Sequence, residues 1–133
     1  MNAKVLIADD HEIVREGIRR LLTDMRPNWQ ICGEVTNGRQ AVEAVKKLKP
    51  DVVVLDITMP GMSGLEAAAH ISKLDPACRI LIFTMHDSDR LGAEIRGVGG
   101  HGYVQKSRAA RDLTLAIERL IEGGTFFDDS GTA

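Results

Sequence analysis

Five polar residues at the ends of apolar segments carry the side chains that phosphoryl transfer needs. In chain order they are Asp9, Asp10, Asp56, Thr84 and Lys106. Asp56 is the most informative, because a carboxylate that ends the apolar run Val52–Leu55 has few structural roles. If the segments are parallel strands, their carboxyl ends meet at one edge of a sheet, where ligands bind. Three carboxylates, one hydroxyl and one ammonium would then converge on one site.

The three carboxylates would repel one another, so at neutral pH they require a nearby cation or a raised pKa. Oxygen donors suit Mg²⁺, which proteins typically hold with one or two carboxylates and phosphate oxygens. The sequence has no histidine–cysteine cluster with the spacing of a zinc site. An aspartate beside Mg²⁺ and a lysine can attack phosphorus while the cations offset charge on the phosphoryl oxygens. The set therefore predicts phosphoryl transfer to an aspartate.

Three of these residues also have a simpler interpretation. Asp10 could cap the helix that follows it, Lys106 could be a solvated cation, and Thr84 could be an ordinary strand residue. The joint placement of all five at matching segment ends favours the functional interpretation. Three histidines fall near the same predicted edge: His11, His86 and His101. No two of them are four residues apart, so we interpret them as loop histidines rather than metal ligands.

Apolar segments alternate with stretches of helical periodicity along the chain. The predicted strands are Lys4–Ala8, Gln30–Val35, Asp51–Asp56, Arg79–Thr84 and Gly102–Gln105. The predicted helices are His11–Asp24, Arg39–Leu48, one from the capping box Ser63–Glu66 to Asp75–Pro76, Ser88–Val98 and Arg108–Glu122. The strand segments are continuously apolar, as strands covered on both faces require. Five such repeats predict a three-layer, doubly wound α/β domain with an open parallel sheet.

The fourth predicted helix is the weakest, because Gly92 and Gly97 lie inside it. Each glycine destabilises a helix by about 1 kcal/mol relative to alanine. The sequence leaves two interpretations open: a marginal helix that packing rescues, or an element kept near instability so that it can shift. Asn37, Ser63 and Ser107 are the predicted N-caps of the second, third and fifth helices.

Composition excludes several classes of protein. The 133 residues are 44% hydrophobic and 27% charged, which fits one globular domain and argues against disorder. The chain has 17 basic and 19 acidic residues and a net charge of −2, so a basic nucleic-acid-binding surface is not expected. Cys32 and Cys78 show no ligand spacing, which favours buried free thiols in a reducing compartment. The first apolar run is too short for a signal peptide or a membrane span, so we expect a cytoplasmic protein.

Four motifs follow one another along the chain: Ile7–His11, Asp56–Gly64, Thr84–His86 and Gly102–Lys106. Together they resemble the receiver domain of bacterial two-component response regulators. The Asp-Asp-His, Thr-Met-His and Gly-Gly-Thr-Phe sequences are most similar to the NarL/FixJ (LuxR-type) subfamily. The resemblance covers residues 3–126 and implies a flavodoxin-like fold with strand order 2-1-3-4-5.

The resemblance implies an acceptor and a metal site. Asp56 would receive a phosphoryl group from a sensor histidine kinase. Asp10, Asp56 and the backbone carbonyl of Thr58 would bind Mg²⁺ directly, and Asp9 would bind it through a water. The acyl phosphate would then hydrolyse slowly, so the chain would be a signalling phosphoacceptor rather than an enzyme.

The resemblance also implies a switch. Lys106 would pair with a phosphoryl oxygen, and the hydroxyl of Thr84 would move toward the phosphoryl group. Tyr103 would follow by turning inward. The surface of helix four, strand five and helix five would then change shape and carry the signal.

Two departures from the family pattern and three alternatives remain. Gly99–Gly100–His101 replaces the more usual alanine-containing stretch before strand five. Most receivers carry proline after the lysine, often across a cis bond, whereas Ser107 follows here, so the geometry of that peptide stays open. A phosphatase that resembles haloacid dehalogenases would need an aspartate at the position of Thr58. A flavodoxin-like cofactor module would need a small-residue phosphate loop where Asp9–Asp10 stand. A pseudo-receiver that only binds partners is the third alternative.

We expect residues 1–126 to form the receiver domain and residues 127–133 to begin an interdomain linker or C-terminal tail. The subfamily normally carries a C-terminal helix-turn-helix domain, so the resemblance implies a transcription regulator whose DNA-binding output domain lies outside this chain. A natural single-domain regulator is the alternative. The chain itself is expected to bind neither DNA nor membrane. Phosphorylation is expected to favour a homodimer, through helices one and five or through the helix four–strand five–helix five face.

Overall fold

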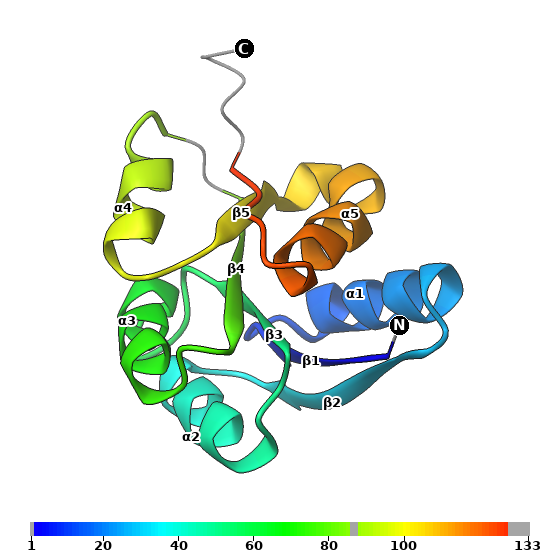
Figure 1. Ribbon diagram of the computed structural model, residues 1–133, viewed down its shortest axis with the longest axis horizontal. Helices are drawn as coiled ribbons and strands as arrows, with labels where there is room; N and C mark the ends of the chain where they lie inside the picture. Colours follow the sequence, from blue (N-terminus) through cyan, green and yellow to red (C-terminus); the bar gives the residue numbers. More distant parts are fainter. Residues whose placement is uncertain (1, 86–87, 128–133) are drawn as a thin grey trace.

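A computed structural model describes residues 2–85 and 88–127 and shows a parallel sheet between two layers of helices (Figure 1). The strands are β1 (Ala3–Ala8), β2 (Trp29–Val35), β3 (Val52–Asp56), β4 (Arg79–Thr84) and β5 (Gly102–Gln105). Their order is β2-β1-β3-β4-β5, and each neighbouring pair is parallel. The predicted doubly wound flavodoxin-like fold and strand order are confirmed.

Helices cover both faces of the sheet. On one face lie α1 (Glu12–Met25) and α5 (Ala109–Ile121), and on the other lie α2 (Gly38–Leu48), α3 (Gly64–Leu74) and α4 (Leu91–Gly97) (Figure 1). Among the helices of the described residues, none has the length and apolar character that crossing a membrane requires. The sheet therefore contributes side chains to two separate cores.

Alternation along the strands explains why they are continuously apolar. In β1, Val5 and Ile7 pack with the core under α1 and α5, whereas Leu6 and Ala8 pack with the core under α2, α3 and α4. All four residues are at most 1% exposed. Successive strand residues point to opposite faces, so a strand covered on both sides needs an apolar residue at every position.

Two of the three predicted helix caps are confirmed. Oδ1 of Asn37 accepts a hydrogen bond from the amide of Gln40 at 2.8 Å, and Oγ of Ser63 accepts one from the amide of Glu66 at 3.2 Å. These bonds satisfy amides that have no partner within the first helical turn. They fix where α2 and α3 begin.

The predicted N-cap at Ser107 is wrong. A 3-10 turn over Lys106–Arg108 follows directly on β5, and the cap residue of α5 is Arg108, which makes no side-chain cap hydrogen bond. The tight turn uses Ser107 in its interior, so the α-helix begins only at Ala109. The Lys106–Ser107 peptide is trans.

Helix α4 is shorter than predicted. It has seven residues, Leu91–Gly97, instead of the predicted Ser88–Val98. Only Leu91 and Ile95 of this helix are buried, and its N-cap residue Arg90 makes no side-chain cap hydrogen bond. A helix of two turns with two glycines and two buried anchors has little local stability.

Both cysteines are free thiols, as predicted. Cys78 is buried and Cys32 is half-buried. Burial raises the pKa of the Cys78 thiol to about 12, which keeps it protonated at neutral pH.

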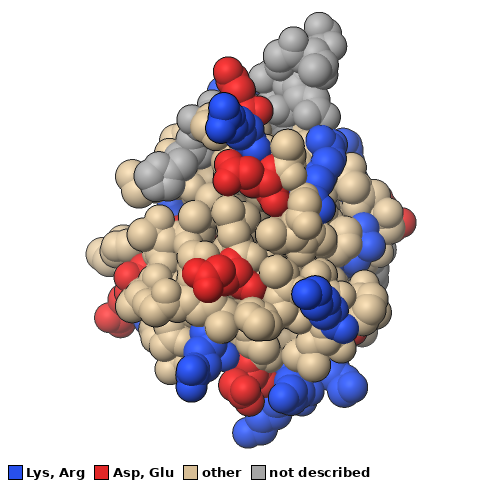
Figure 2. All heavy atoms as spheres, turned by 90° about the vertical axis from the view of Figure 1, so that its left-hand side faces the viewer, with Lys and Arg blue, Asp and Glu red and all other residues tan. Residues whose placement is uncertain are grey.

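The surface of α2, α3 and α4 carries charges of both signs. Figure 2 shows blue and red side chains interspersed with neutral ones on this face, without a continuous basic patch among its described residues. This pattern agrees with the net charge of −2. The described residues of this face therefore do not form the positively charged surface that attracts nucleic acid.

Candidate functional site

The carboxyl ends of the strands bring the predicted residues to one edge of the sheet. Asp9 directly follows β1, Asp56 ends β3, Thr84 ends β4 and Lys106 directly follows β5. Because β1 and β3 are neighbours, Asp9 and Asp56 emerge side by side. Their side chains are only 2% and 6% exposed. The predicted convergence of carboxylates and ammonium is therefore present.

Lys106 supplies the positive charge of the site. Its Nζ lies 2.8 Å from Oδ2 of Asp9 and 3.5 Å from Oδ1 of Asp56. Oδ2 of Asp9 is buried and accepts no well-aligned hydrogen bond within the described chain, so its ion pair with Lys106 balances it. One ammonium shared between two buried carboxylates leaves net negative charge in the site.

Asp56 has a destabilised carboxylate. Burial raises the pKa of the Asp56 carboxyl above its ordinary value, and the charge of Asp9 raises it further. Two groups lower the Asp56 pKa without cancelling this rise: Lys106 and the amide of Thr58. The Thr58 nitrogen lies 3.4 Å from Oδ1 of Asp56. The ionised acceptor therefore gains from any additional cation that enters the site.

The raised pKa predicts how Asp56→Asn changes stability with pH. The folded state holds the Asp56 proton more tightly than the unfolded state, so stability falls as pH rises from the ordinary carboxyl pKa of 3.8 through the folded-state pKa. The asparagine in Asp56→Asn does not ionise, so the variant does not lose stability as pH rises through this range. In EDTA near pH 7 we expect the variant to be more stable than wild type by on the order of 1 kcal/mol. Urea unfolding across this pH range measures it, and a difference that does not change with pH would contradict the prediction.

Gly64 lets α3 begin directly beside the acceptor. A Cβ at this position would lie 2.0 Å from the backbone oxygen of Asp56 and 2.9 Å from Cα of Ile57. The amide of Gly64 donates a 2.8 Å hydrogen bond to the oxygen of Ile57. Only a residue without a side chain fits this approach, so Gly64 fixes the backbone that carries Asp56.

Gly64→Ala is expected to destabilise the domain by about 3 kcal/mol, because the new methyl group meets backbone that cannot rotate away. The matched control is Gly17→Ala in α1, where a Cβ meets nothing within 4 Å. That change should stabilise the domain by up to about 1 kcal/mol through helix propensity. Denaturant unfolding of both variants tests the pair. Equal effects of the two substitutions would contradict the close-packing argument.

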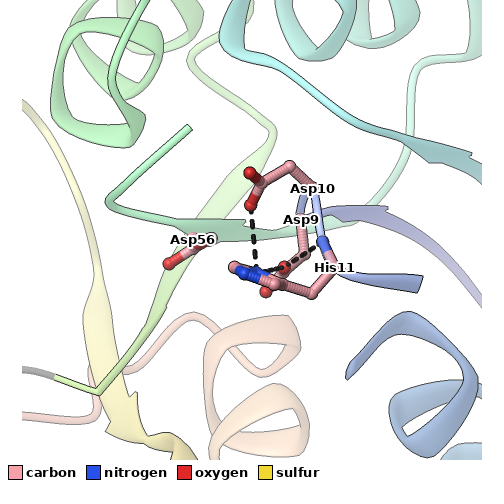
Figure 3. Close-up of side chains that lie close together, drawn as sticks. All are labelled: Asp9, Asp10, His11 and Asp56. Carbon is pink, nitrogen blue, oxygen red and sulfur yellow. Dashed lines mark hydrogen bonds and ion pairs between the residues drawn. The ribbon is translucent and has the colours of Figure 1, made fainter. Parts of the chain in front are cut away.

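His11 lies in the loop between β1 and α1, as predicted, and its ring reaches the carboxylates of the site. Its Nδ1 lies 3.2 Å from Oδ1 of Asp9 and 3.1 Å from Oδ1 of Asp10 (Figure 3). The amide of His11 also donates a 2.9 Å hydrogen bond to Oδ1 of Asp9. His11, not Asp10, is the N-cap residue of α1, and its side chain makes no cap hydrogen bond. Asp10 therefore does not serve as the helix cap.

The prediction that His101 lies at this edge is wrong. His101 precedes β5, so it lies at the opposite end of the strand from Lys106. Its Nδ1 accepts a 2.9 Å hydrogen bond from the amide of Ile80, near the start of β4. Burial lowers the pKa of His101, and the nearby Arg79 lowers it further. His86 lies outside the described residues.

The two predicted switch residues are both buried. Thr84 is fully buried and Tyr103 is 5% exposed. The ring of Tyr103 packs edge-on against Phe127 at 6.3 Å between centroids, and the guanidinium of Arg96 from α4 lies 3.8 Å from the Phe127 centroid. The segment after α5 also pairs with β5, since the amide of Tyr103 donates to the oxygen of Phe126 at 2.9 Å. Tyr103 is thus enclosed between the sheet and Phe127.

Comparison with known proteins decides the family. Residues 5–118 match the family profile described as "Response regulator receiver domain". The chain is a response regulator receiver domain. The receiver is 37% identical over 119 residues to the response regulator UvrY of Escherichia coli K12 and 32% identical over 123 residues to the transcriptional regulatory protein DegU of Brevibacillus brevis. These matches cover 90% and 92% of the receiver but 54% and 52% of the relatives, so it spans about half their length.

Solved structures place the receiver in the NarL/FixJ subfamily. A LuxR-family response regulator from Aurantimonas sp. SI85-9A1 superposes with a TM-score of 0.89 at 40% identity, covering 95% of the receiver and 89% of that chain. The isolated receiver domain of RcsB from Salmonella enterica, solved with the phosphomimetic BeF₃⁻, gives a TM-score of 0.86 at 29% identity, covering 98% and 96%. The receiver is a phosphoacceptor module of signal transduction rather than a conventional enzyme.

The acidic cluster fits a divalent cation and is typical of a receiver's magnesium site. One donor atom each from Asp9, Asp10, Asp56 and His11 lies within 4.8 Å of all the others. Three of these donors are carboxylate oxygens, the hard ligands that Mg²⁺ prefers.

Proposed function

We propose that this receiver takes a phosphoryl group from a sensor histidine kinase onto Asp56. The observation that carries the proposal is a buried carboxylate at the end of β3 with a lysine Nζ 3.5 Å away and two further carboxylates beside it. An oxygen of Asp56 attacks phosphorus, a P–O bond forms, and the P–N bond of the phosphohistidine breaks as its imidazole leaves. Attack by water later returns Asp56 to the free carboxylate and releases inorganic phosphate.

Lys106 has two tasks in this proposal. Its positive charge favours the ionised form of Asp56 and partly offsets the effect of burial on the Asp56 pKa. It also lies close enough to pair with an oxygen of the phosphoryl group once Asp56 carries it. Positive charge in a buried site stabilises the charge that builds up on those oxygens.

We propose that Asp10, Asp56 and the backbone carbonyl of Thr58 hold Mg²⁺ directly, with Asp9 acting through a water. Bound there, the ion would neutralise the excess negative charge of the site and of the phosphoryl oxygens. The support is the carboxylate cluster and the raised pKa of Asp56, which both favour an added cation. The amide of Thr58 already contacts Asp56, so the loop that carries its carbonyl lies at the site.

We propose that Thr84 and Tyr103 transmit phosphorylation to the surface of α4, β5 and α5. Thr84 ends the strand next to Asp56, where its hydroxyl can follow the phosphoryl group. Tyr103 contacts Phe127, which in turn contacts Arg96 of α4, so a shift of Tyr103 reaches α4 through Phe127. The short, glycine-containing α4 resists such a shift weakly.

We propose that the output is control of transcription through a DNA-binding domain beyond this chain, in a cytoplasmic protein that pairs on phosphorylation. The support is the family, the half-length match to UvrY and DegU, and a solved structure of RcsB dimers bound to DNA. We propose residues 1–126 as the receiver and 127–133 as the start of a linker or tail, of which 128–133 lie outside the described residues.

Intact-mass measurement after incubation with acetyl phosphate tests the proposed function. We expect a gain of one phosphoryl group in Mg²⁺ and no gain in EDTA. The small donor removes any dependence on the unidentified kinase. No gain under either condition, from protein that melts cooperatively, would leave a pseudo-receiver that acts by binding alone.

A further inference from the structure

The imidazole of His11 is the one nitrogen donor within the acidic cluster of the described chain (Figure 3). It reaches the site because three consecutive residues, Asp9, Asp10 and His11, form the turn between β1 and α1. The backbone bond from the His11 amide to Oδ1 of Asp9 fixes this turn. The ring has no helix-capping hydrogen bond, so nothing in the cap requires it to lie there.

The donor spacing matches that around an octahedral ion. At metal–ligand distances of about 2.1 Å, adjacent donors lie about 3.0 Å apart and opposite donors about 4.2 Å apart. Nδ1 of His11 lies 3.2 Å from the Asp9 oxygen and 3.1 Å from the Asp10 oxygen. The donor atoms of Asp10, His11 and Asp56 lie within 4.8 Å of one another, so a small contraction would bring all three onto one ion, with Asp9 beside them.

We propose that Nδ1 of His11 is an additional metal ligand that shifts this receiver toward first-row transition-metal dications relative to Mg²⁺. The inference deepens the proposed magnesium site and rests on it. Imidazole is a good ligand for cobalt, nickel and zinc, whereas Mg²⁺ prefers oxygen donors and bound water. A site that adds one imidazole to the oxygens of Asp10, Asp56 and Thr58 therefore discriminates among dications more than an all-oxygen site does.

A simple ion pair is the competing explanation. The side chain of His11 is 65% exposed, and an imidazolium beside two carboxylates would show the same distances. In that case the His11 ring would move away when a metal ion binds. Replacing His11 would then remove a positive charge that competes with the metal ion for the carboxylates. The two explanations thus predict opposite changes in transition-metal affinity when His11 is replaced.

Calorimetric titration with Co²⁺ and Mg²⁺ distinguishes them. In His11→Phe we expect the Kd for Co²⁺ to rise at least about tenfold, since loss of even an outer-shell partner weakens metal sites by 10–100-fold. The Kd for Mg²⁺ should change much less. The matched control is His70→Gln on the exposed surface of α3, which should change neither value. Unchanged or tighter Co²⁺ binding in His11→Phe would overturn the inference.

Pulsed EPR of Mn²⁺ bound to the unaltered protein gives a second test that does not depend on a variant. We expect a nitrogen coupling from one imidazole, which changes to the ¹⁵N pattern when the histidines are labelled. Mn²⁺ bound without any nitrogen coupling would overturn the inference while leaving the proposed function intact. Wild-type labelling by acetyl phosphate in Mg²⁺ reports the proposed function separately, so failure of that function is recognised by its own measurement.

Discussion

We expect Asp56→Asn to take up no phosphoryl group from acetyl phosphate under conditions that label the wild type. The side-chain amide cannot act as the attacking oxyanion, and the neighbouring buried carboxylate of Asp9 is paired with Lys106 at 2.8 Å. The loss should be complete within the sensitivity of intact-mass measurement. The substitution preserves shape and removes a charge that burial disfavours, so the variant should fold.

The matched control is Asp10→Asn, whose side chain is 30% exposed. It removes a proposed metal ligand but keeps the acceptor, so we expect slower labelling with the phosphoryl group still on the protein. Full-rate labelling of Asp56→Asn would show that another residue is the acceptor. This contrast separates the roles of two carboxylates in one cluster.

Lys106→Ala has the second largest expected effect. Removing the ammonium leaves Asp9 and Asp56 without the ion pairs at 2.8 and 3.5 Å, so the charge that develops on the phosphoryl oxygens is less well stabilised. We expect labelling by acetyl phosphate to slow about 100-fold, the size typical of losing one such electrostatic contact. A time course of intact mass in saturating Mg²⁺ measures the rate.

The same variant should bind Mg²⁺ more tightly than wild type. The ammonium competes with a metal ion for the carboxylates, so its removal favours the ion while it harms the chemistry. Lys73→Ala on the exposed surface of α3 is the control and should change neither quantity. Normal labelling together with unchanged Mg²⁺ affinity would remove Lys106 from the site's function.

The convergence of Asp9, Asp56 and Lys106 was predictable because parallel strands share a direction. Once the strands are identified, the residue after each one must lie at the same edge of the sheet. The same logic places His101 at the opposite edge, since four strand residues at about 3.3 Å each separate it from Lys106. The error for His101 came from judging nearness along the sequence rather than along the strand.

The role of His11 was not predictable in the same way. Its φ and ψ of −101° and 114° are extended, and its ring lies beside Asp9 and Asp10 in the turn before α1. Spacing rules for histidine ligands look for pairs four residues apart on a helix, so they miss a ligand in a turn. The available signal was its position directly after two acidic residues at the end of a strand.

Two further features could not be predicted from the sequence: the packing of Phe127 and the length of α4. Glycine content identified α4 as weak, but where it starts depends on how Leu91 and Ile95 anchor to the core. Phe127 contacts Tyr103 and Arg96, which are 24 and 31 positions earlier in the sequence. Contacts of that range come from the tertiary fold and not from local pattern.

Locating the phosphoryl group tests the central claim most directly. Wild-type protein is labelled with acetyl phosphate in Mg²⁺, the acyl phosphate is trapped by borohydride reduction, and the modified residue is identified by peptide mass spectrometry. We predict a single modified residue, Asp56. Modification of Asp9, Asp10 or His11 instead would contradict the assignment of the acceptor, and with it the account of how β3, Gly64 and Lys106 build this site.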